Sequence, residues 1–240
     1  AAIISLGRDM TALAETKLKG REVPIYTIPN WAELDLIGAE SKESNSILKE
    51  LELVEQFIFL YAGNMGRTHD IESIADLAAE MRSFENVHFL FVGFGAKKEW
   101  LEKTRADKDL NNITILPAKA RSEQPIFLNA CDVAIISFVS GMAGVSVPSR
   151  MYNQMAAGKP ILAIADKNSE LAMVVEEEKI GWVVAPGDFS GLCDTYRQIM
   201  ASPELCRKMG ARAEQVAKNK YSFRRAIVSY REALEEIASS

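Results

Sequence analysis

The chain has 240 residues, of which 48% are hydrophobic and 25% are charged, with 14 glycines and 8 prolines. This composition excludes a collagen-like chain, a disulfide scaffold and an intrinsically disordered protein. The net charge is −5, without long runs of one sign, which argues against nucleic acid as the main partner because sequence-independent binders of nucleic acid are basic.

Cysteine and histidine usage argues against metal and redox chemistry. The two histidines are too few for most zinc sites, and the cysteines form no CxxC pair. We therefore expect no metal site, and buried free thiols in a reducing compartment at Cys131, Cys193 and Cys206.

The start of the chain, AAIISLGRDM, has no basic residues before its apolar run, so it is not a signal peptide. No apolar stretch reaches the length of about 18 residues that a membrane span needs. We interpret the first residues as a strand and a turn entered partway, and expect the chain to be a piece of a longer protein.

Short apolar runs rich in β-branched and aromatic residues recur along the chain. Most are continuously apolar, which is typical of parallel strands covered on both faces. They predict strands at 23–28, 57–62, 87–93, 113–116, 133–137, 161–165 and 182–185.

Helical periodicity lies between these runs. Asp70 precedes the first of these segments as a plausible N-cap. The pattern predicts helices at 71–81, 97–106, 122–130, 149–157, 168–178, 190–201, 203–218 and 222–238. Alternating strands and helices predict a doubly wound α/β fold with a parallel sheet.

The chain divides into three parts. Residues 1–28 are interpreted as a remnant of, or a linker from, a preceding domain, followed by a polar connection to about residue 50. Residues 29–220 form the main domain. Residues 221–240 are one amphipathic helix, and two alternatives stay open for it: packing on its own domain, or docking on a missing one.

In a parallel sheet, ligands bind beyond the carboxyl ends of the strands. After the strand at 57–62, Gly63 and Gly66 allow tight turns before a helix, and Arg67 offers a guanidinium to phosphate oxygens. An ordinary turn with a solvated arginine is the alternative. Gly93, after the next strand, is a weaker signal of the same kind.

The most distinctive segment follows the strand at 133–137. A loop rich in glycine and serine leads through Val147 and Pro148 to Ser149, the predicted N-cap of a helix that Gly158 ends. Backbone amides, Ser146, Ser149 and Arg150 are expected to converge on a phosphate. Asn153, one turn further on, is placed to bond sugar hydroxyls.

Other catalytic patterns are missing from the sequence. There is no Ser–His–Asp set and no obvious pair of loop carboxylates. Asp132 lies at the wrong end of its strand for the site and is interpreted as structural, while Asp166 and Asp188 are interpreted as cap or turn residues.

Taken in order, these segments resemble the nucleotide-sugar-binding C-terminal domain of GT-B glycosyltransferases, and glycosyltransferase family 4 most of all. The resemblance covers about residues 24–240. It lies in the IPNW linker, the YAGNMGR loop, the FVGFG turn, the ACDVAIIS strand, the PSRMYNQMAAGKPILA helix, and the closing segments GWVVAPGD and KYSFRRAIVSYREAL.

Some positions depart from the family's pattern. The family carries two glutamates around the glycine-rich loop, and this chain has Val145 and Asn153 in their places. The resemblance implies that Asn153 holds the ribose diol without charge, whereas Val145 cannot contact the donor sugar as a glutamate does. Asn64 stands where the family has an arginine, so Arg67 is expected to substitute.

The resemblance implies a Rossmann-like fold and a retaining transfer from a nucleotide sugar, a UDP-sugar by preference, without a metal. Arg67 and Arg150 would be catalytic, stabilising the departing diphosphate. The residues expected to contact the donor are Gly63, Asn64, Gly66, Gly93, Ser146, Val147, Pro148, Ser149 and Asn153.

The acceptor, a saccharide or a lipid-linked saccharide, would bind mainly to an N-terminal domain that is largely absent here. We therefore expect the chain to bind donor and to turn over poorly or not at all. The PSR helix start resembles a branch that acts in surface-polysaccharide synthesis. A cytoplasmic location is expected, and peripheral association of the full-length protein with the inner face of a membrane stays open.

Three other functions are weighed against this one. A nucleotide-sugar epimerase or hydrolase would need acid and base groups that the loops lack. An NAD-type oxidoreductase would need GxGxxG after its first strand. A non-catalytic nucleotide-binding domain stays open because both family glutamates are replaced.

Overall fold

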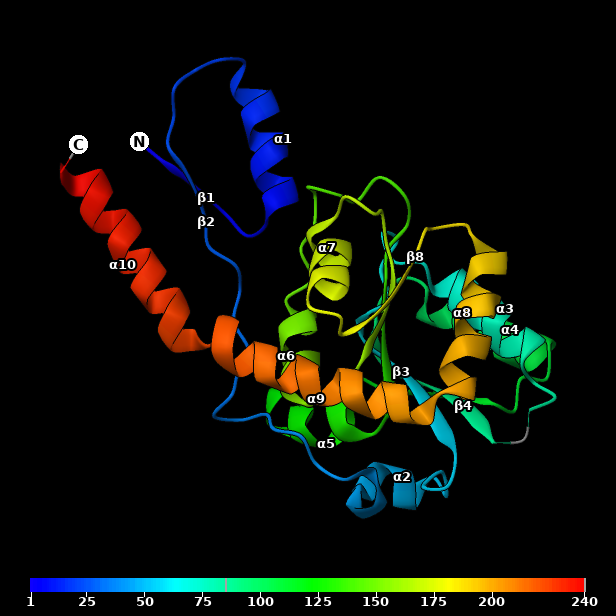
Figure 1. Ribbon diagram of the computed structural model, residues 1–240. Helices are drawn as coiled ribbons and strands as arrows, with labels where there is room; N and C mark the ends of the chain where they lie inside the picture. Colours follow the sequence, from blue (N-terminus) through cyan, green and yellow to red (C-terminus); the bar gives the residue numbers. More distant parts are fainter. Residues whose placement is uncertain (85, 240) are drawn as a thin grey trace.

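The computed structural model describes residues 1–84 and 86–239. Its main part is a parallel six-stranded sheet with the strand order β5-β4-β3-β6-β7-β8 (Figure 1). This is the order of a doubly wound fold, with the switch point between β3 and β6, and it confirms the predicted parallel α/β architecture. The strands are β3 (Phe57–Asn64), β4 (Val87–Phe94), β5 (Ile113–Leu116), β6 (Val133–Ser137), β7 (Ile161–Ile164) and β8 (Gly181–Val184).

Helices cover both faces of the sheet. One face packs against α2 (Ser46–Glu50), α5 (Gln124–Asn129), α6 (Arg150–Ala156), α7 (Glu170–Glu177) and α9 (Pro203–Lys220). The other packs against α3 (Ile71–Glu80), α4 (Lys98–Asp107) and α8 (Phe189–Ala201). Along β3, Ile58 and Leu60 enter the first core, and Phe59 and Tyr61 the second. Burial on both faces explains why the strands are continuously apolar.

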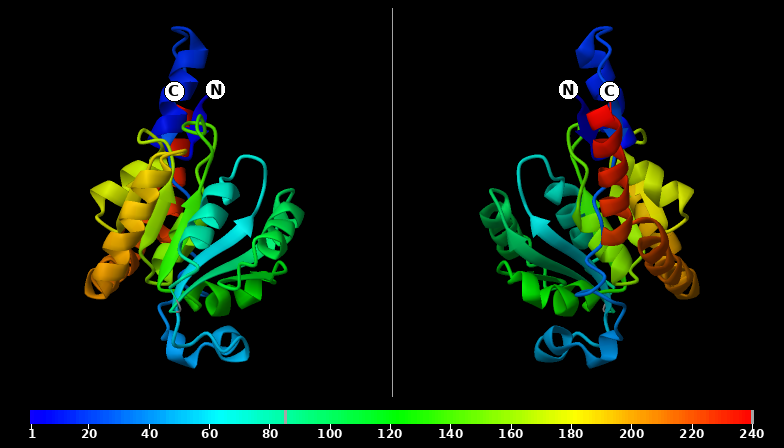
Figure 2. Two further views of the ribbon diagram at one scale, coloured as in Figure 1. Left: turned by 90° about the vertical axis from the view of Figure 1, so that its right-hand side faces the viewer. Right: turned by 90° about the vertical axis from the view of Figure 1, so that its left-hand side faces the viewer.

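The two ends of the chain lie together beside the main sheet. β1 (Ile3–Ser5) and β2 (Ile25–Thr27) form a separate two-stranded parallel sheet, joined by α1 (Arg8–Leu18). The last helix, α10 (Phe223–Ser239), runs away from the main body towards this unit (Figure 1), and Figure 2 shows both at one end of the molecule. Two short 3-10 turns complete the described elements, η1 (Lys42–Ser44) and η2 (Arg121–Glu123).

The sequence missed two helices. The turn expected after the first strand is instead α1, and α2 lies inside the stretch interpreted as a connection. The pattern of α1 is weak because Asp9 is its one buried residue, so burial imposes no apolar face on it. α2 has five residues, too few to show a helical period.

Several local predictions are confirmed. Asp70 Oδ1 accepts the Ser73 N–H at 3.0 Å and caps α3, and Gly158, with φ of 67°, follows the end of α6. Ser149 occupies the N-cap position of α6, but its hydroxyl makes no capping hydrogen bond. Asp132 is structural, because its carboxylate accepts the Ile58 N–H at 2.8 Å and the Lys42 ammonium at 2.6 Å.

The three cysteines are buried free thiols, as predicted. Burial raises the pKa of Cys131 to about 12, so this thiol stays protonated and unreactive at neutral pH. No described helix is long and apolar enough to cross a bilayer.

Candidate functional site

A cleft of about 660 Å³ opens at the switch point of the sheet, where a doubly wound fold places its ligand. Its walls come from the ends of β3 and β4, the loop before α6, α6 itself and the segment from Asn30 to Glu33. The size suits a nucleotide-sized ligand. The predicted residues that line it are Gly63, Asn64, Gly93, Ser146, Val147, Pro148, Ser149, Arg150 and Asn153.

Two predicted site residues are not brought to this cleft. Gly66 and Arg67 lie in the loop between β3 and α3, and neither belongs to the cleft lining. Arg67 is exposed. The N-terminus of α3 is capped by the Asp70 carboxylate, so the anion site predicted there already holds a protein anion.

Arg150 is a cation of the cleft lining that is not paired with a carboxylate among the described residues. Its Nη1 donates to the Tyr61 hydroxyl at 3.1 Å, and its guanidinium carbon lies 4.8 Å from the centroid of the Tyr61 ring. Its Nε and Nη2 are buried and find no hydrogen-bond partner among the described residues. Buried guanidinium donors left without an acceptor suit an anionic ligand that binds there.

Gly63 makes room for this arrangement. A Cβ built at residue 63 would lie 2.6 Å from Arg150 Nη1, and the φ of 139° is one that side chains rarely adopt. Glycine is therefore needed where β3 ends, so that the guanidinium can lie against the backbone.

His69 lines the cleft and was not predicted as a site residue. Burial lowers its pKa to about 4, and the positive charges of Arg150 and Lys97 add to this effect. Its ring centroid lies 5.1 Å from that of Phe138. His69 is therefore neutral at pH 7, and the signal that would have found it is its place in the loop that follows β3.

The glycine-rich loop before α6 is held by carboxylates. Asp166 Oδ2 accepts the N–H groups of Gly141, Met142 and Ala143 at 2.9, 3.0 and 3.2 Å. Asp9 Oδ2 accepts the Gly144 N–H at 2.9 Å. These four of the backbone amides expected to converge on a phosphate are thus already bonded, which the sequence could not reveal.

The next two amides of the loop are also bonded, because the N–H groups of residues 145 and 146 donate to the Met142 carbonyl. The N–H groups of Val147, Ser149 and Arg150 have no described hydrogen-bond partner, and the Arg150 side chain is the charged donor that this wall presents to an anion.

The cleft has one carboxylate among its described lining residues, that of Glu33. Arg121 donates from Nε to Oε2 at 2.9 Å, and its Nη2 lies 2.9 Å from Oε1. Asn153 Oδ1 accepts the Glu33 N–H at 3.0 Å, and its Nδ2 donates to Gln124 Oε1 at 3.2 Å. Asn153 therefore already has protein partners on both sides of its amide.

Within residues 1–84 and 86–239, no group of three or more histidine, cysteine, aspartate or glutamate side chains is arranged to hold a metal ion.

The family model for glycosyl transferases group 1 matches residues 43–216. The chain is 32% identical over 186 residues to a probable glycosyltransferase, WbjE, of Pseudomonas aeruginosa, covering 78% of this chain and 46% of that protein. It is 26% identical over 205 residues to a putative colanic acid biosynthesis glycosyl transferase, WcaI, of Escherichia coli K12, covering 84% of this chain and 50% of that protein. The chain thus spans about half the length of these relatives.

Solved structures agree on the fold. Anabaena Alr3699/HepE, in complex with UDP and glucose, matches with a TM-score of 0.82 at 16% identity, covering 100% of this chain and 63% of that one. WaaG, a glycosyltransferase involved in lipopolysaccharide biosynthesis, matches with a TM-score of 0.72 at 14% identity, covering 94% and 61%.

The family match extends over most of the chain. It includes the ends of β3 and β4 and the loop before α6, but not the cleft wall at Asn30–Glu33. It favours a sugar transferase over the NAD-type oxidoreductase weighed above. The chain belongs to the glycosyl transferases group 1 family and has the fold of the GT-B glycosyltransferases.

Proposed function

We propose that this chain is the donor-binding half of a retaining glycosyltransferase that takes its sugar from a UDP-sugar in surface-polysaccharide synthesis. The observation that carries the proposal is Arg150, a cation in the switch-point cleft with two buried guanidinium nitrogens that lack a described acceptor. A nucleoside diphosphate supplies acceptors of the right charge. Uridine is supported by the UDP complex of the structurally similar HepE, and the polysaccharide context by the name of the relative WcaI.

The proposed chemistry is electrostatic. When the bond between the anomeric carbon and the diphosphate oxygen breaks, the electron pair goes to that oxygen and negative charge grows on the diphosphate. Arg150 stabilises this charge from a fixed position, and no metal is needed for that task. His69 stays neutral beside it and does not compete for the diphosphate as a second cation. Retention follows from the family resemblance.

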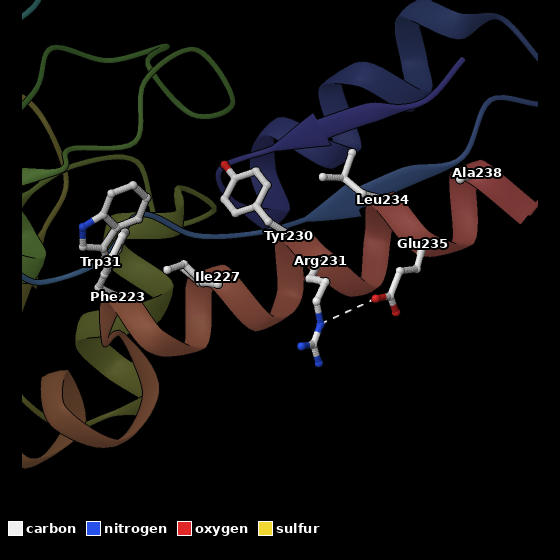
Figure 3. Close-up of a pocket in the computed structure, with 9 residues that line it drawn as sticks. Trp31, Phe223, Ile227, Tyr230, Arg231, Leu234, Glu235 and Ala238 are labelled. Atoms are coloured by element: carbon white, nitrogen blue, oxygen red, sulfur yellow. Dashed lines mark ion pairs between the residues drawn. The ribbon is translucent and has the colours of Figure 1, made fainter.

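We also propose that the whole protein has a further domain, on which α10 docks. Phe223, Ile227, Tyr230 and Leu234 project from one side of α10, with Trp31 beside Phe223 (Figure 3). They line an apolar groove of about 620 Å³, in which Phe223 is 51% exposed and Leu234 is 58% exposed. The relatives are about twice as long, which supports assigning residues 1–28 to that domain and the acceptor site to the missing half.

Calorimetric titration of the chain with UDP tests donor binding. We expect Arg150→Ala to bind UDP about 10- to 100-fold more weakly, the value of hydrogen bonds to a charged group. The matched control is Arg197→Ala, since Arg197 is exposed on α8 and pairs with Asp194 away from the cleft. Equal UDP affinity in wild type and Arg150→Ala would contradict the proposal, as would a wild-type chain that binds no UDP.

A further inference from the structure

The charged side chains that line the cleft differ in whether a neighbouring residue already pairs with them. Its lining contains the cations Lys119, Arg121 and Arg150. Lys119 lies 3.4 Å from the Glu123 carboxylate, and Arg121 pairs with Glu33, so both are neutralised by neighbours. Arg150 has no carboxylate within ion-pairing distance among the described residues. Arg150 is therefore the unpaired cation that attracts a phosphate, whereas the Glu33–Arg121 pair carries no net charge.

The backbone of Glu33 is fixed on both sides. Its N–H donates to Asn153 Oδ1 at 3.0 Å, and its carbonyl accepts the N–H groups of Leu36 and Ile37 at 3.0 and 2.8 Å. The side chain is 25% exposed and is held by Arg121 through both oxygens. Each carboxylate oxygen keeps a second lone pair for a ligand donor.

The distance from Arg150 limits which ligand group can reach Glu33. Arg150 and Asn153 are three residues apart on α6, so their side chains are neighbours on one face, with Cβ atoms about 5–6 Å apart. Asn153 in turn bonds the backbone of Glu33. In a nucleotide whose diphosphate lies against Arg150, the group about one helical turn away is the ribose, and the base lies further out.

We propose that Glu33 accepts a hydrogen bond from a ribose hydroxyl of the donor nucleotide, and that Asn153 positions Glu33 rather than binding the diol itself. This inference rests on the proposed function and deepens it. It assigns the binding of the ribose, the role expected of Asn153, to the Glu33 carboxylate, which lies far from Asn153 in the sequence. It also explains why the amide of Asn153 is already bonded to Glu33 and Gln124.

The test compares UDP with 2′-deoxy-UDP and 3′-deoxy-UDP by calorimetry. The wild-type chain is expected to bind UDP about 10-fold or more tightly than at least one of the two, because the deoxy analogue leaves the carboxylate without its donor. The analogue that loses affinity identifies the hydroxyl. The Glu33→Gln variant should bind UDP only as tightly as the wild-type chain binds this analogue. The affinity of the variant for the analogue itself should differ from that of wild type by less than twofold.

Controls separate this role from a structural one. Glu204→Gln removes a carboxylate that pairs with Arg207 on the exposed side of α9, and it should leave the preference for UDP unchanged. A Glu33→Gln chain that keeps the full preference overturns the inference, as does one that loses UDP and both analogues equally. If UDP binding depends on Arg150 but the preference survives Glu33→Gln, this inference fails alone. If UDP does not bind, both proposals fail.

Discussion

The protein provides partners for only part of the Arg150 guanidinium. Nη1 donates to the Tyr61 hydroxyl and the group lies over the Tyr61 ring, while Nε and Nη2 are buried without a described acceptor. An unpaired buried donor costs about 1–3 kcal/mol, more for a charged group, so such an arrangement is rarely kept for stability alone. A bound diphosphate would supply the missing acceptors. Under the proposed function, Arg150 therefore contributes to ligand binding more than to the stability of the fold.

The pKa of His69 is expected to respond to a diphosphate bound at Arg150. In the free chain its pKa is about 4, below the usual 6.5, through burial first and the charges of Arg150 and Lys97 next. As the pH falls, His69 is therefore protonated in the unfolded chain before it is protonated in the folded one. Its contribution to the free energy of unfolding is lost as the pH falls from about 6.5 towards 4. UDP on Arg150 should cancel part of the repulsion and raise the pKa.

NMR titration of the His69 ring with and without UDP measures this shift. An unchanged or lower pKa with UDP bound would contradict the placement of the diphosphate. His88, whose pKa is also lowered to about 4 by burial but which bonds Thr114 away from the cleft, is the internal control and should not respond.

At the scale of elements, the loop before α6 is held in place from two sides. Asp166 follows β7 and accepts three loop amides, and Asp9, from α1, accepts the Gly144 N–H. Asp9 also accepts the Glu170 N–H at 3.0 Å at the start of α7. The loop that forms one wall of the cleft therefore depends on the N-terminal unit of residues 1–28 as well as on the main sheet.

Removing Asp166 should release this loop. In Asp166→Ala, three amides lose their acceptor, and we expect a loss of about 1–3 kcal/mol in the free energy of unfolding, measured in urea. Hydrogen exchange at Gly141, Met142 and Ala143 should accelerate beyond the global change. The control Asp188→Ala removes a helix cap from α8, which costs about 1 kcal/mol, and should leave these amides protected. Loop amides that stay protected in Asp166→Ala would refute this account.

At the scale of the molecule, α10 has an apolar face that the described residues leave exposed. Its buried residues are Ala226 and Ala233, while the large apolar side chains lie outside. Leu234→Ser should therefore change the unfolding free energy of this chain by less than about 0.5 kcal/mol, as exposed substitutions do. In a protein that includes the proposed N-terminal domain, it should lower the melting temperature.

Thermal unfolding of both forms tests this, with Leu205→Ser on α9 as the matched exposed leucine, 42% exposed. An equal loss in the short and long forms would argue that α10 packs only on its own domain. The same pair of proteins tests turnover, since we expect sugar transfer from the long form and donor binding without transfer from the chain alone.

Much of the fold is visible in the sequence, because the inner strands β3, β4, β6 and β7 are buried on both faces and so appear as apolar runs. The strand at 133–137 was predicted with its observed bounds. The helices α1 and α2 were missed because they bury little or are too short to show a period. At the cleft, the position of Gly63 and Gly93 at the ends of strands was the signal that predicted them as site residues. Their positive φ confirms that glycine is needed there.

The sequence by itself determined the parallel α/β class, the family resemblance and the position of a cleft at the carboxyl ends of β3 and β4. These depend on local patterns: apolar runs, capping residues and turn chemistry. Only the tertiary structure decided which charges meet. It placed Arg150 against Tyr61, left Arg67 outside the cleft, gave the loop amides to Asp166 and Asp9, and joined Glu33 to Asn153 across 120 residues of chain. Partners so distant in sequence come together through packing, which no local pattern encodes.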